Sequence, residues 1–470
     1  MGKYSLLAKN TLLVFGGGIG AKLITLFMMP LYTRWLSVDG YGEMDLITVY
    51  VTLLISIVSF CIPEALFVFP CGATKSKQKS YFTSGVLFNF LTLIVTFIIF
   101  LNTNYLSKCY NWNNSFTDNI WLIYSMLVSG IIQQQVQQFS RSTNHMIVYS
   151  VTGIIFAICV LLLSFYFVKY YGVNGYVYCI TIANIVSALF CSIFSKIYKY
   201  IDISYFNISV IKEMLFYSIP LIPNSVMWWF VNALNRPIME DELGMHDVGI
   251  YAVASRFPGV LSVLFTMFTA SWQISAIEEF NSNGYKVFYN RILKLVFNIL
   301  IIILIGIVLF SKILVKLLAD SSFYNAWLYI PILTYGTFIS CISAFIGVNF
   351  IASRESKYFF YSSLFGALAS VSLNFILIPM FGMWGACISV VISFFVIALS
   401  RWIYANKYVR ISNISYYLLL LFIVSIIIVT YTLNYMIISC ILALILFIYI
   451  IISNRQELTI IKSKIKSSLH

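Results

Sequence analysis

A single lysine interrupts the apolar stretch FGGGIGAKLITLFMMP, residues 15–30. Lys22 has no charged neighbour between Lys9 and Arg34. In a membrane-spanning helix, a lysine that faces lipid costs about 3 kcal/mol on insertion scales, whereas one that faces a wet cavity costs little. We therefore expect Lys22 to point into a cavity, where it binds an anion. The alternative is a structural role as the partner of Glu64 or of a backbone carbonyl.

Two arginines extend this positive charge. Arg256 lies about eight residues into an apolar segment over 249–275. Arg34 lies at the outer end of the segment that holds Lys22, where it is alternatively an interfacial residue with its head in water. These cations oppose one acid within the apolar segments, Glu64. A cavity with surplus positive charge suits an anionic ligand.

A run of glutamines ends another apolar segment in the sequence IIQQQVQQFSR. Gln134, Gln138 and Arg141 are spaced i, i+4 and i+7, so a helix places them on one face. They form either a hydrogen-bonding ledge for a sugar or polar headgroup, or an ordinary cap at the membrane interface.

A second polar face occurs in IPLIPNSVMWWFVNALNRP, where Asn224, Trp228 and Asn232 recur every four residues. Amides hydrogen-bond hydroxyl groups, and an indole combines an apolar ring with a polar N–H, so these side chains suit a sugar. A tryptophan pair at the membrane interface is the alternative. Pro220 and Pro223 are expected to bend this helix if they lie beyond its first turn.

Enzyme signatures are not found. His145, His246 and His470 are far apart, and no Walker A, HExxH, GxSxG or DxD sequence occurs. The nine cysteines include no CxxC pair and mostly lie in apolar runs. We therefore predict no catalytic residue, no metal site and no cofactor.

The composition shows where these residues must lie. The 470 residues are 61% hydrophobic and 10% charged, against about 25% charged in soluble domains. Many apolar runs reach the 18 or more residues that cross a bilayer. The chain is thus predicted to be an all-α polytopic membrane protein. Its net charge of +13 is explained by basic cytoplasmic loops rather than by nucleic-acid binding.

About fourteen transmembrane helices are predicted, with no connecting loop longer than about twenty residues. They cover 11–33, 44–69, 81–101, 120–140, 147–168, 173–195, 213–234, 249–275, 290–310, 326–350, 357–378, 383–403, 414–432 and 435–453.

The orientation follows from the basic residues. With the N-terminus inside, 21 Lys and Arg lie in cytoplasmic segments, including Arg401, and six lie outside, including Arg236. Lys22 and Arg256 remain within spans. Basic residues favour the cytoplasmic side, so both termini are predicted to be cytoplasmic.

The chain also repeats itself at an offset of 207 to 210 residues. The matches are Pro30 with Pro237, Leu36 with Leu243, Gly42 with Gly249, and YGVNG at 171–175 with FGMWG at 381–385. They predict two parallel six-helix lobes, at 1–200 and 205–408, related by an axis along the membrane normal. Residues 409–470 add two spans and a basic tail. Chance matches in a biased composition are the alternative.

Three longer phrases resemble the polysaccharide flippases of the MOP superfamily, the Wzx and polysaccharide-transporter group. They are YSIPLIPNSV at 217–226, LGMHDVGIYAVASRF at 243–257 and LNFILIPMFGMWGACISVVIS at 373–393. The resemblance implies a MATE-like fold in the bacterial inner membrane. It also implies that the protein moves an undecaprenyl-pyrophosphate-linked oligosaccharide, for O-antigen or capsule, from the cytoplasmic to the periplasmic leaflet. The expected mechanism is alternating access through a cationic central cavity.

The expected partners are this lipid-linked substrate, membrane lipids, and polymerase and chain-length proteins of the same pathway. Two other functions remain open. A MATE-type drug/cation antiporter is expected to carry acidic cavity residues, and here Glu64 stands alone. A membrane-embedded polysaccharide polymerase or ligase is expected to carry a long catalytic loop, whereas the longest external loop, 102–119, is nearly uncharged.

Overall fold

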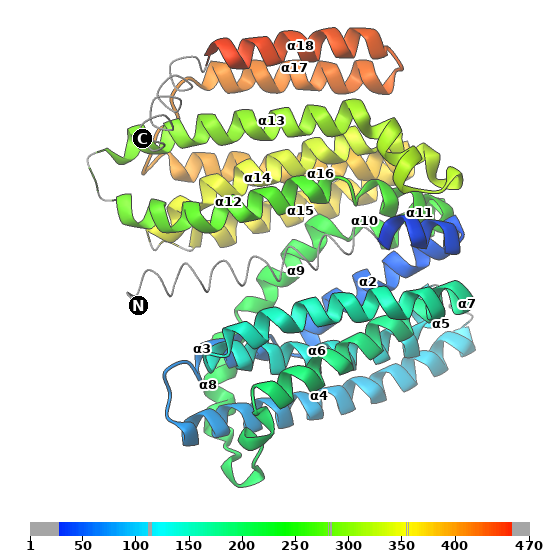
Figure 1. Cartoon of the computed structure of the whole chain (residues 1–470), viewed down its shortest axis with the longest axis vertical. Coiled ribbons are helices and arrows are strands. Elements are labelled where there is room, and N and C mark those ends of the chain that lie inside the picture. The colour runs from blue at the N-terminus through cyan, green and yellow to red at the C-terminus, as the bar shows by residue number, and fades with distance from the viewer. Residues whose placement is uncertain are drawn as a thin grey trace, which may run out of the picture. The chain divides into compact units, whose positions relative to one another are not determined.

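The computed structural model describes residues 28–453 apart from 111–114, 281, 283, 354 and 356. Helices are the only regular elements in this described part, which confirms the all-α prediction (Figure 1). Of the predicted first span, only the end is described, as a helix over 28–35. Lys22 lies outside the described residues.

The chain forms two compact units. The first holds the described residues up to Val253, with Leu318–Phe323 and Val371–Ala386, and the second holds the rest. The helices up to the boundary are α2 (Val38–Val58), α3 (Ile62–Val68), α4 (Lys75–Tyr110), α5 (Ser115–Asp118), α6 (Ile120–Ser142), α7 (Met146–Phe194), η1 (Ile197–Tyr200), η2 (Ile203–Tyr205), α8 (Ile208–Ser218), α9 (Leu221–Asn232), α10 (Asn235–Leu243) and α11 (Met245–Ala254). Those after it are α12 (Pro258–Glu279), α13 (Tyr285–Leu318), η3 (Ser321–Leu328), α14 (Ile330–Ala352), α15 (Lys357–Phe381), α16 (Met383–Ala405), α17 (Ile414–Thr432) and α18 (Met436–Ser453).

Ten described helices are long and apolar enough to cross a membrane, or up to eleven if the bent pair α8 and α9 is one span. Four of the fourteen predicted spans are not counted among the ten. The first lies mostly outside the described residues, and the bent pair α8 and α9 is the second. Two further features account for the others. Helix α7, with 49 residues, contains a kink at Gly172, between the predicted spans 147–168 and 173–195. Helix α6, which carries the glutamines, is not among the ten.

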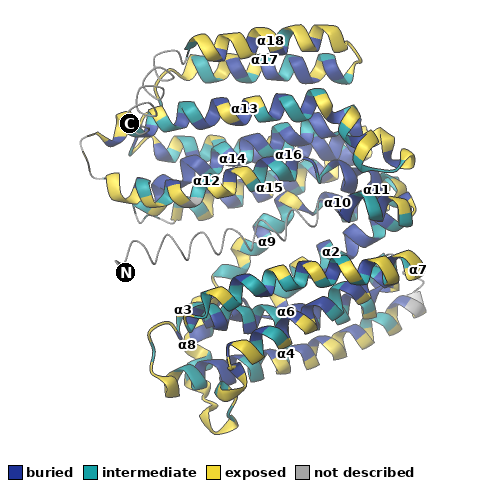
Figure 2. Cartoon of the chain, in the orientation of Figure 1, coloured by how far each residue is buried: buried dark blue, intermediate teal, exposed yellow. Residues whose placement is uncertain are grey.

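Apolar side chains cover the outer surface, as a membrane protein requires. Figure 2 shows exposed residues along α17 and α18, where Ile437 is 77% exposed and Leu444 is 60% exposed. Exposed apolar area of this extent marks contact with lipid or with another protein. This surface agrees with the predicted multi-pass membrane protein.

Three predicted spans are broken or bent near prolines. The span 44–69 divides between α2 and α3, because Phe60 and Cys61 adopt left-handed conformations just before Pro63. Proline cannot donate the helical hydrogen bond and restricts the residue before it. The span 249–275 divides at the turn 255–257, just before Pro258, and α8 meets α9 at a 41° bend beside Pro220. The expected bend in this helix is thus observed.

Two arginines that the charge count placed in cytoplasmic or external segments are buried instead. Arg236 is 9% exposed and Arg401 is 1% exposed. Arg401 lies in α16, and it donates from Nε to the Ser362 hydroxyl and from Nη1 to the Ser343 carbonyl. The corrected count is 20 basic residues inside (21 minus Arg401) and 5 outside (6 minus Arg236), so the predicted orientation does not depend on either residue.

The paired glycines of the repeat make one reciprocal contact. A Cβ on Gly42 would lie 2.6 Å from the carbonyl oxygen of Met245, and a Cβ on Gly249 would overlap the carbonyl oxygen of Val38. Met245 and Val38 are themselves 207 residues apart, the same offset as the glycines. The start of α2 and the start of α11 therefore approach each other closely enough to exclude any side chain.

The second repeat phrase also has one conformation in both copies. Gly172 and Gly382 both have φ of 58°, which strongly favours glycine. A Cβ on Gly175 or on Gly385 would overlap the carbonyl oxygen eight residues earlier in the chain in each case. The sequence matches therefore correspond to matching backbone geometry.

We predict that Gly249→Ala destabilises the purified protein by about 1–3 kcal/mol or more, because the new methyl group meets backbone that cannot rotate away. Gly306→Ala is the matched control, since a Cβ at this glycine in α13 meets nothing within 4 Å. Thermal unfolding in detergent measures both. Equal midpoints for the two variants would show that the α2–α11 contact is not close.

Candidate functional site

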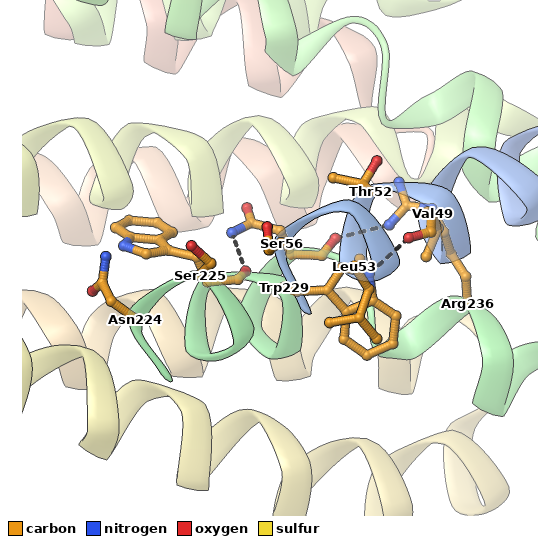
Figure 3. A pocket seen from close by; sticks show the side chains of 11 residues that line it. Val49, Thr52, Leu53, Ser56, Asn224, Ser225, Trp229 and Arg236 are labelled. Carbon is orange, nitrogen blue, oxygen red and sulfur yellow. Dashed lines mark hydrogen bonds between the residues drawn. The ribbon is translucent and has the colours of Figure 1, made fainter. Parts of the chain in front are cut away.

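A pocket of about 480 Å³ lies between α2 and α9, within the first unit (Figure 3). This volume is in the range of pockets that bind small ligands. Its lining consists of Val49, Thr52, Leu53 and Ser56 from α2 and Asn224, Ser225, Trp228, Trp229, Asn232, Ala233 and Arg236 from α9 and the start of α10. This lining contains one cation and no carboxylate.

The polar stripe predicted on one helix face is present on α9. Asn224, Trp228 and Asn232 all line the pocket. The side chains of Asn224 and Trp228 make no hydrogen bond with any described residue. Asn232 donates to the carbonyl of Trp228 at 2.7 Å, so its amide oxygen remains able to accept. The stripe therefore offers amide and indole groups to a ligand.

Helix α2 is held against α9 by a direct hydrogen bond. The indole nitrogen of Trp229 donates to the carbonyl oxygen of Val49 at 2.9 Å, as the dashed line in Figure 3 shows. Thr52 donates to the carbonyl of Thr48, one turn earlier in its own helix. The pocket wall on α2 is thus regular helix, with Thr52 and Ser56 as its polar side chains.

A buried ion pair closes one end of the pocket. Arg236 Nε donates to Asp45 Oδ2 at 2.6 Å, and Nη1 donates to the carbonyl of Asn232 at 2.8 Å. The guanidinium also lies 5.3 Å from the centre of the Tyr251 ring. Burying a charge is costly unless a partner compensates it. The carboxylate of Asp45 compensates the buried charge of Arg236. The pair joins α2 to the start of α10.

Glu64 does not line the α2–α9 pocket. It is exposed, in the first turn of α3, and its carboxylate makes no hydrogen bond or ion pair with any described residue. Cys61, three residues earlier, interacts with the pocket residue Ser225. The predicted pairing of Glu64 with Lys22 falls outside the described residues.

The glutamine face packs on α3. The Arg141 guanidinium lies 4.0 Å from the centre of the Phe67 ring and 5.5 Å from that of Tyr149. Arg141 Nε and Gln138 Oε1 are buried without a hydrogen-bond partner among the described residues. Gln134 is half-buried on the same helix. Neither Gln138 nor Arg141 lines the α2–α9 pocket, so these residues form a separate polar cluster.

The two remaining predicted cations occupy turns or helix ends. Arg34 is exposed and lies close to Asp320. Hydrogen bonds from Ser322 lower the pKa of the Asp320 carboxyl. The positive charge of Arg34 lowers this pKa further. Arg256 is half-buried in the turn 255–257 between α11 and α12, rather than within a continuous helix. Neither residue lines the α2–α9 pocket.

Sequence reasoning missed Arg236, although a signal was present. It follows Asn224, Trp228 and Asn232 at the same spacing of four residues. The predicted span ended at 234, which left Arg236 in an external loop. The chain instead forms a turn at 233–234 and then starts the helix α10, whose second residue, Arg236, lines the same pocket as the polar stripe.

Comparison with solved structures defines the fold. A multidrug-resistance MATE transporter of the MOP superfamily, in an inward-facing conformation, superposes with a TM-score of 0.68 and 15% identity, over 82% of this chain and 94% of the transporter. The lipid II flippase MurJ, in an inward closed conformation, gives a TM-score of 0.68 and 12% identity, over 95% of this chain and all of MurJ. The fold matches that of these two structures, which confirms the MATE-like prediction.

The sequence comparison defines the family. Residues 7–273, more than half of the chain, match the family described as polysaccharide biosynthesis protein. The chain therefore belongs to the polysaccharide biosynthesis protein family. A relative, the capsular polysaccharide biosynthesis protein CapF of Staphylococcus aureus, is 22% identical over 205 residues, which are 43% of this chain. The match spans about half of the length of CapF (52%).

We predict that Asp45→Asn and Arg236→Gln each destabilise the protein by about 3–5 kcal/mol, because each leaves one buried charge without its partner. The double variant is expected to be less destabilised than the sum of the two. Thermal unfolding of the four proteins forms the double-mutant cycle. If the losses in the free energy of unfolding simply add in the double variant, the two side chains do not interact.

Proposed function

We propose that this protein is a flippase for a lipid-linked oligosaccharide, and that the α2–α9 pocket contacts the sugar. The observation that carries the proposal is the pocket lining: amide and indole groups that can still hydrogen-bond a ligand at Asn224, Trp228 and Asn232, one compensated cation and no carboxylate. Membership of the polysaccharide biosynthesis family supports a glycan as the cargo.

The lining fits a sugar better than it fits an organic cation. Trp228 offers a ring face and an N–H, and the amides of Asn224 and Asn232 offer hydrogen bonds to hydroxyl groups. A buried cationic ligand is costly unless a negative charge, such as a carboxylate, compensates it. The described lining has no carboxylate, which counts against the drug-antiporter alternative.

The proposed lipid carrier is undecaprenyl pyrophosphate, and its charge favours outward movement. A pyrophosphate diester carries about two negative charges. A potential of about 100 mV, negative inside, contributes roughly 2.3 kcal/mol per charge, or about 4–5 kcal/mol for two charges moved fully outward. The membrane potential therefore drives the proposed direction without ATP. Lys22 and Arg256 are the proposed contacts of the diphosphate.

A transport role, rather than an enzymatic one, makes a specific prediction. In cells without this gene, lipid-linked repeat units are expected to form normally and to accumulate in the cytoplasmic leaflet. Trp228→Ala is expected to lower their appearance in the periplasmic leaflet about tenfold, since a lost contact of about 1.4 kcal/mol changes an equilibrium tenfold. Leaflet-selective labelling with a glycan-binding lectin measures both.

The matched control is Trp121→Ala, which removes a tryptophan that is 39% exposed on α6 and does not line the pocket. This variant is expected to transport normally at equal abundance. If membranes without the protein failed to synthesise the lipid-linked glycan, the protein would be an enzyme such as a polymerase or ligase. Equal transport by Trp228→Ala and Trp121→Ala would remove the pocket from the mechanism.

The proposed cations make a second prediction. Lys22→Ala and Arg256→Ala are each expected to reduce surface glycan strongly, and Lys22→Arg to retain part of it, because arginine preserves the positive charge. Glu64→Gln is expected to reduce surface glycan less than Lys22→Ala does if Glu64 only neutralises Lys22. If Glu64 carries a coupling proton, Glu64→Gln is expected to reduce surface glycan as strongly as Lys22→Ala does, and the loss is expected to depend on pH. A normal amount of surface glycan in cells with the well-expressed double variant Lys22→Ala, Arg256→Ala would contradict the cationic site.

A further inference from the structure

A second polar pocket, distant in sequence from the proposed sugar site, lies within the second unit. It has a volume of about 320 Å³ and lies where α13 and α17 begin and α18 ends. Its lining consists of Val287, Asn290, Arg291, Lys294, Ser412, Asn413, Tyr416, Tyr417 and Ser453. Two cations and no acid are present, so the pocket favours an anionic group.

The two cations differ in how they are held. Lys294 is half-buried, donates to the carbonyl of Ser453 at 2.8 Å and lies 5.5 Å from the centre of the Tyr416 ring. Arg291 is exposed and makes no hydrogen bond or ion pair with any described residue. One positive charge is therefore fixed in position, and a second one beside it remains available to a ligand.

An apolar cavity of about 270 Å³ adjoins this pocket, and Tyr417 lines both. The cavity lies among α13, α14, α16 and α17, and its lining is almost entirely apolar: Leu293, Phe297, Ile342, Ile346, Phe395, Ala398, Leu399, Trp402, Ile411, Ile414, Tyr417, Leu418 and Leu421. The indole N–H of Trp402 is buried and has no hydrogen-bond partner among the described residues. It is thus available to an oxygen atom of a bound molecule.

We propose that these two adjoining pockets bind one anionic phospholipid of the surrounding membrane. The phosphate lies against Arg291 and Lys294, and one acyl chain enters the apolar cavity, with Tyr417 between headgroup and chain. An amphiphile of this kind matches a cationic pocket and an apolar cavity that meet at one side chain. The apolar, exposed face of α17 places the cavity beside the lipid phase.

A phospholipid fits the apolar cavity better than the long lipid carrier of a glycan does. A volume of about 270 Å³ admits part of one hydrocarbon chain. The proposed lipid would tie α17 and α18 to α13, since Lys294 on α13 already bonds the end of α18. We therefore assign the lipid a stabilising role for the two C-terminal helices.

The test uses the full chain, delipidated in detergent, without any glycan substrate. Native mass spectrometry measures the apparent Kd for phosphatidylglycerol and for phosphatidylcholine with the same acyl chains. The wild-type protein is expected to bind phosphatidylglycerol more tightly. The double variant Arg291→Gln, Lys294→Gln is expected to bind it about tenfold more weakly, a change of about 1.4 kcal/mol, and to bind phosphatidylcholine as before.

Two further variants separate the charge from the cavity. Lys286→Gln, which removes an exposed charge from the same end of α13 but from neither pocket, is expected to change nothing. Ala398→Leu, which partly fills the cavity, is expected to weaken both lipids. Equal affinity for the two headgroups, an unchanged double variant, or displacement of phosphatidylglycerol by a polyprenyl monophosphate at equal concentration would each overturn the proposal. Each outcome is independent of flippase activity.

Discussion

The close approach of α2 and α11 constrains the geometry of the proposed sugar site. Gly42 and Gly249 let each helix meet a backbone carbonyl of the other, at Met245 and Val38. Helix α2 then continues into one wall of the pocket, and α9 and α10, which precede α11 directly, form the other wall. With one end of both walls fixed, the Asp45–Arg236 pair and the Trp229–Val49 hydrogen bond can form.

This arrangement explains why polar groups can line a pocket in so apolar a chain. The carboxylate of Asp45 compensates the charge of Arg236, so the pocket contains a cation without an unpaired buried charge. The side chains of Asn224 and Trp228 on α9 have no hydrogen-bond partner among the described residues, and a ligand or water must satisfy them. A polyhydroxyl ligand supplies many such partners, and family membership makes a glycan the natural candidate.

Much of the fold was predictable from sequence, because apolar run length determines membrane helices directly. The breaks were harder to predict. Phe60 and Cys61 adopt left-handed conformations, which their residue types do not predict. The kink at Gly172 interrupts an otherwise continuous apolar helix. For the site, the recurrence of polar residues every four positions on α9 predicted its polar face. Arg236 was missed because its burial depends on Asp45, which is 191 residues earlier in the chain.

Direct contact between the glycan and the α2–α9 pocket is the central claim, and photocrosslinking tests it most directly. A photoreactive residue would replace Ser225, which lines the pocket, or Phe216, which is 88% exposed on α8 and does not line it. Both proteins would be irradiated in membranes that contain radiolabelled lipid-linked oligosaccharide. The account predicts strong labelling of the glycan portion from position 225 and little from position 216. Equal labelling from both positions would contradict it.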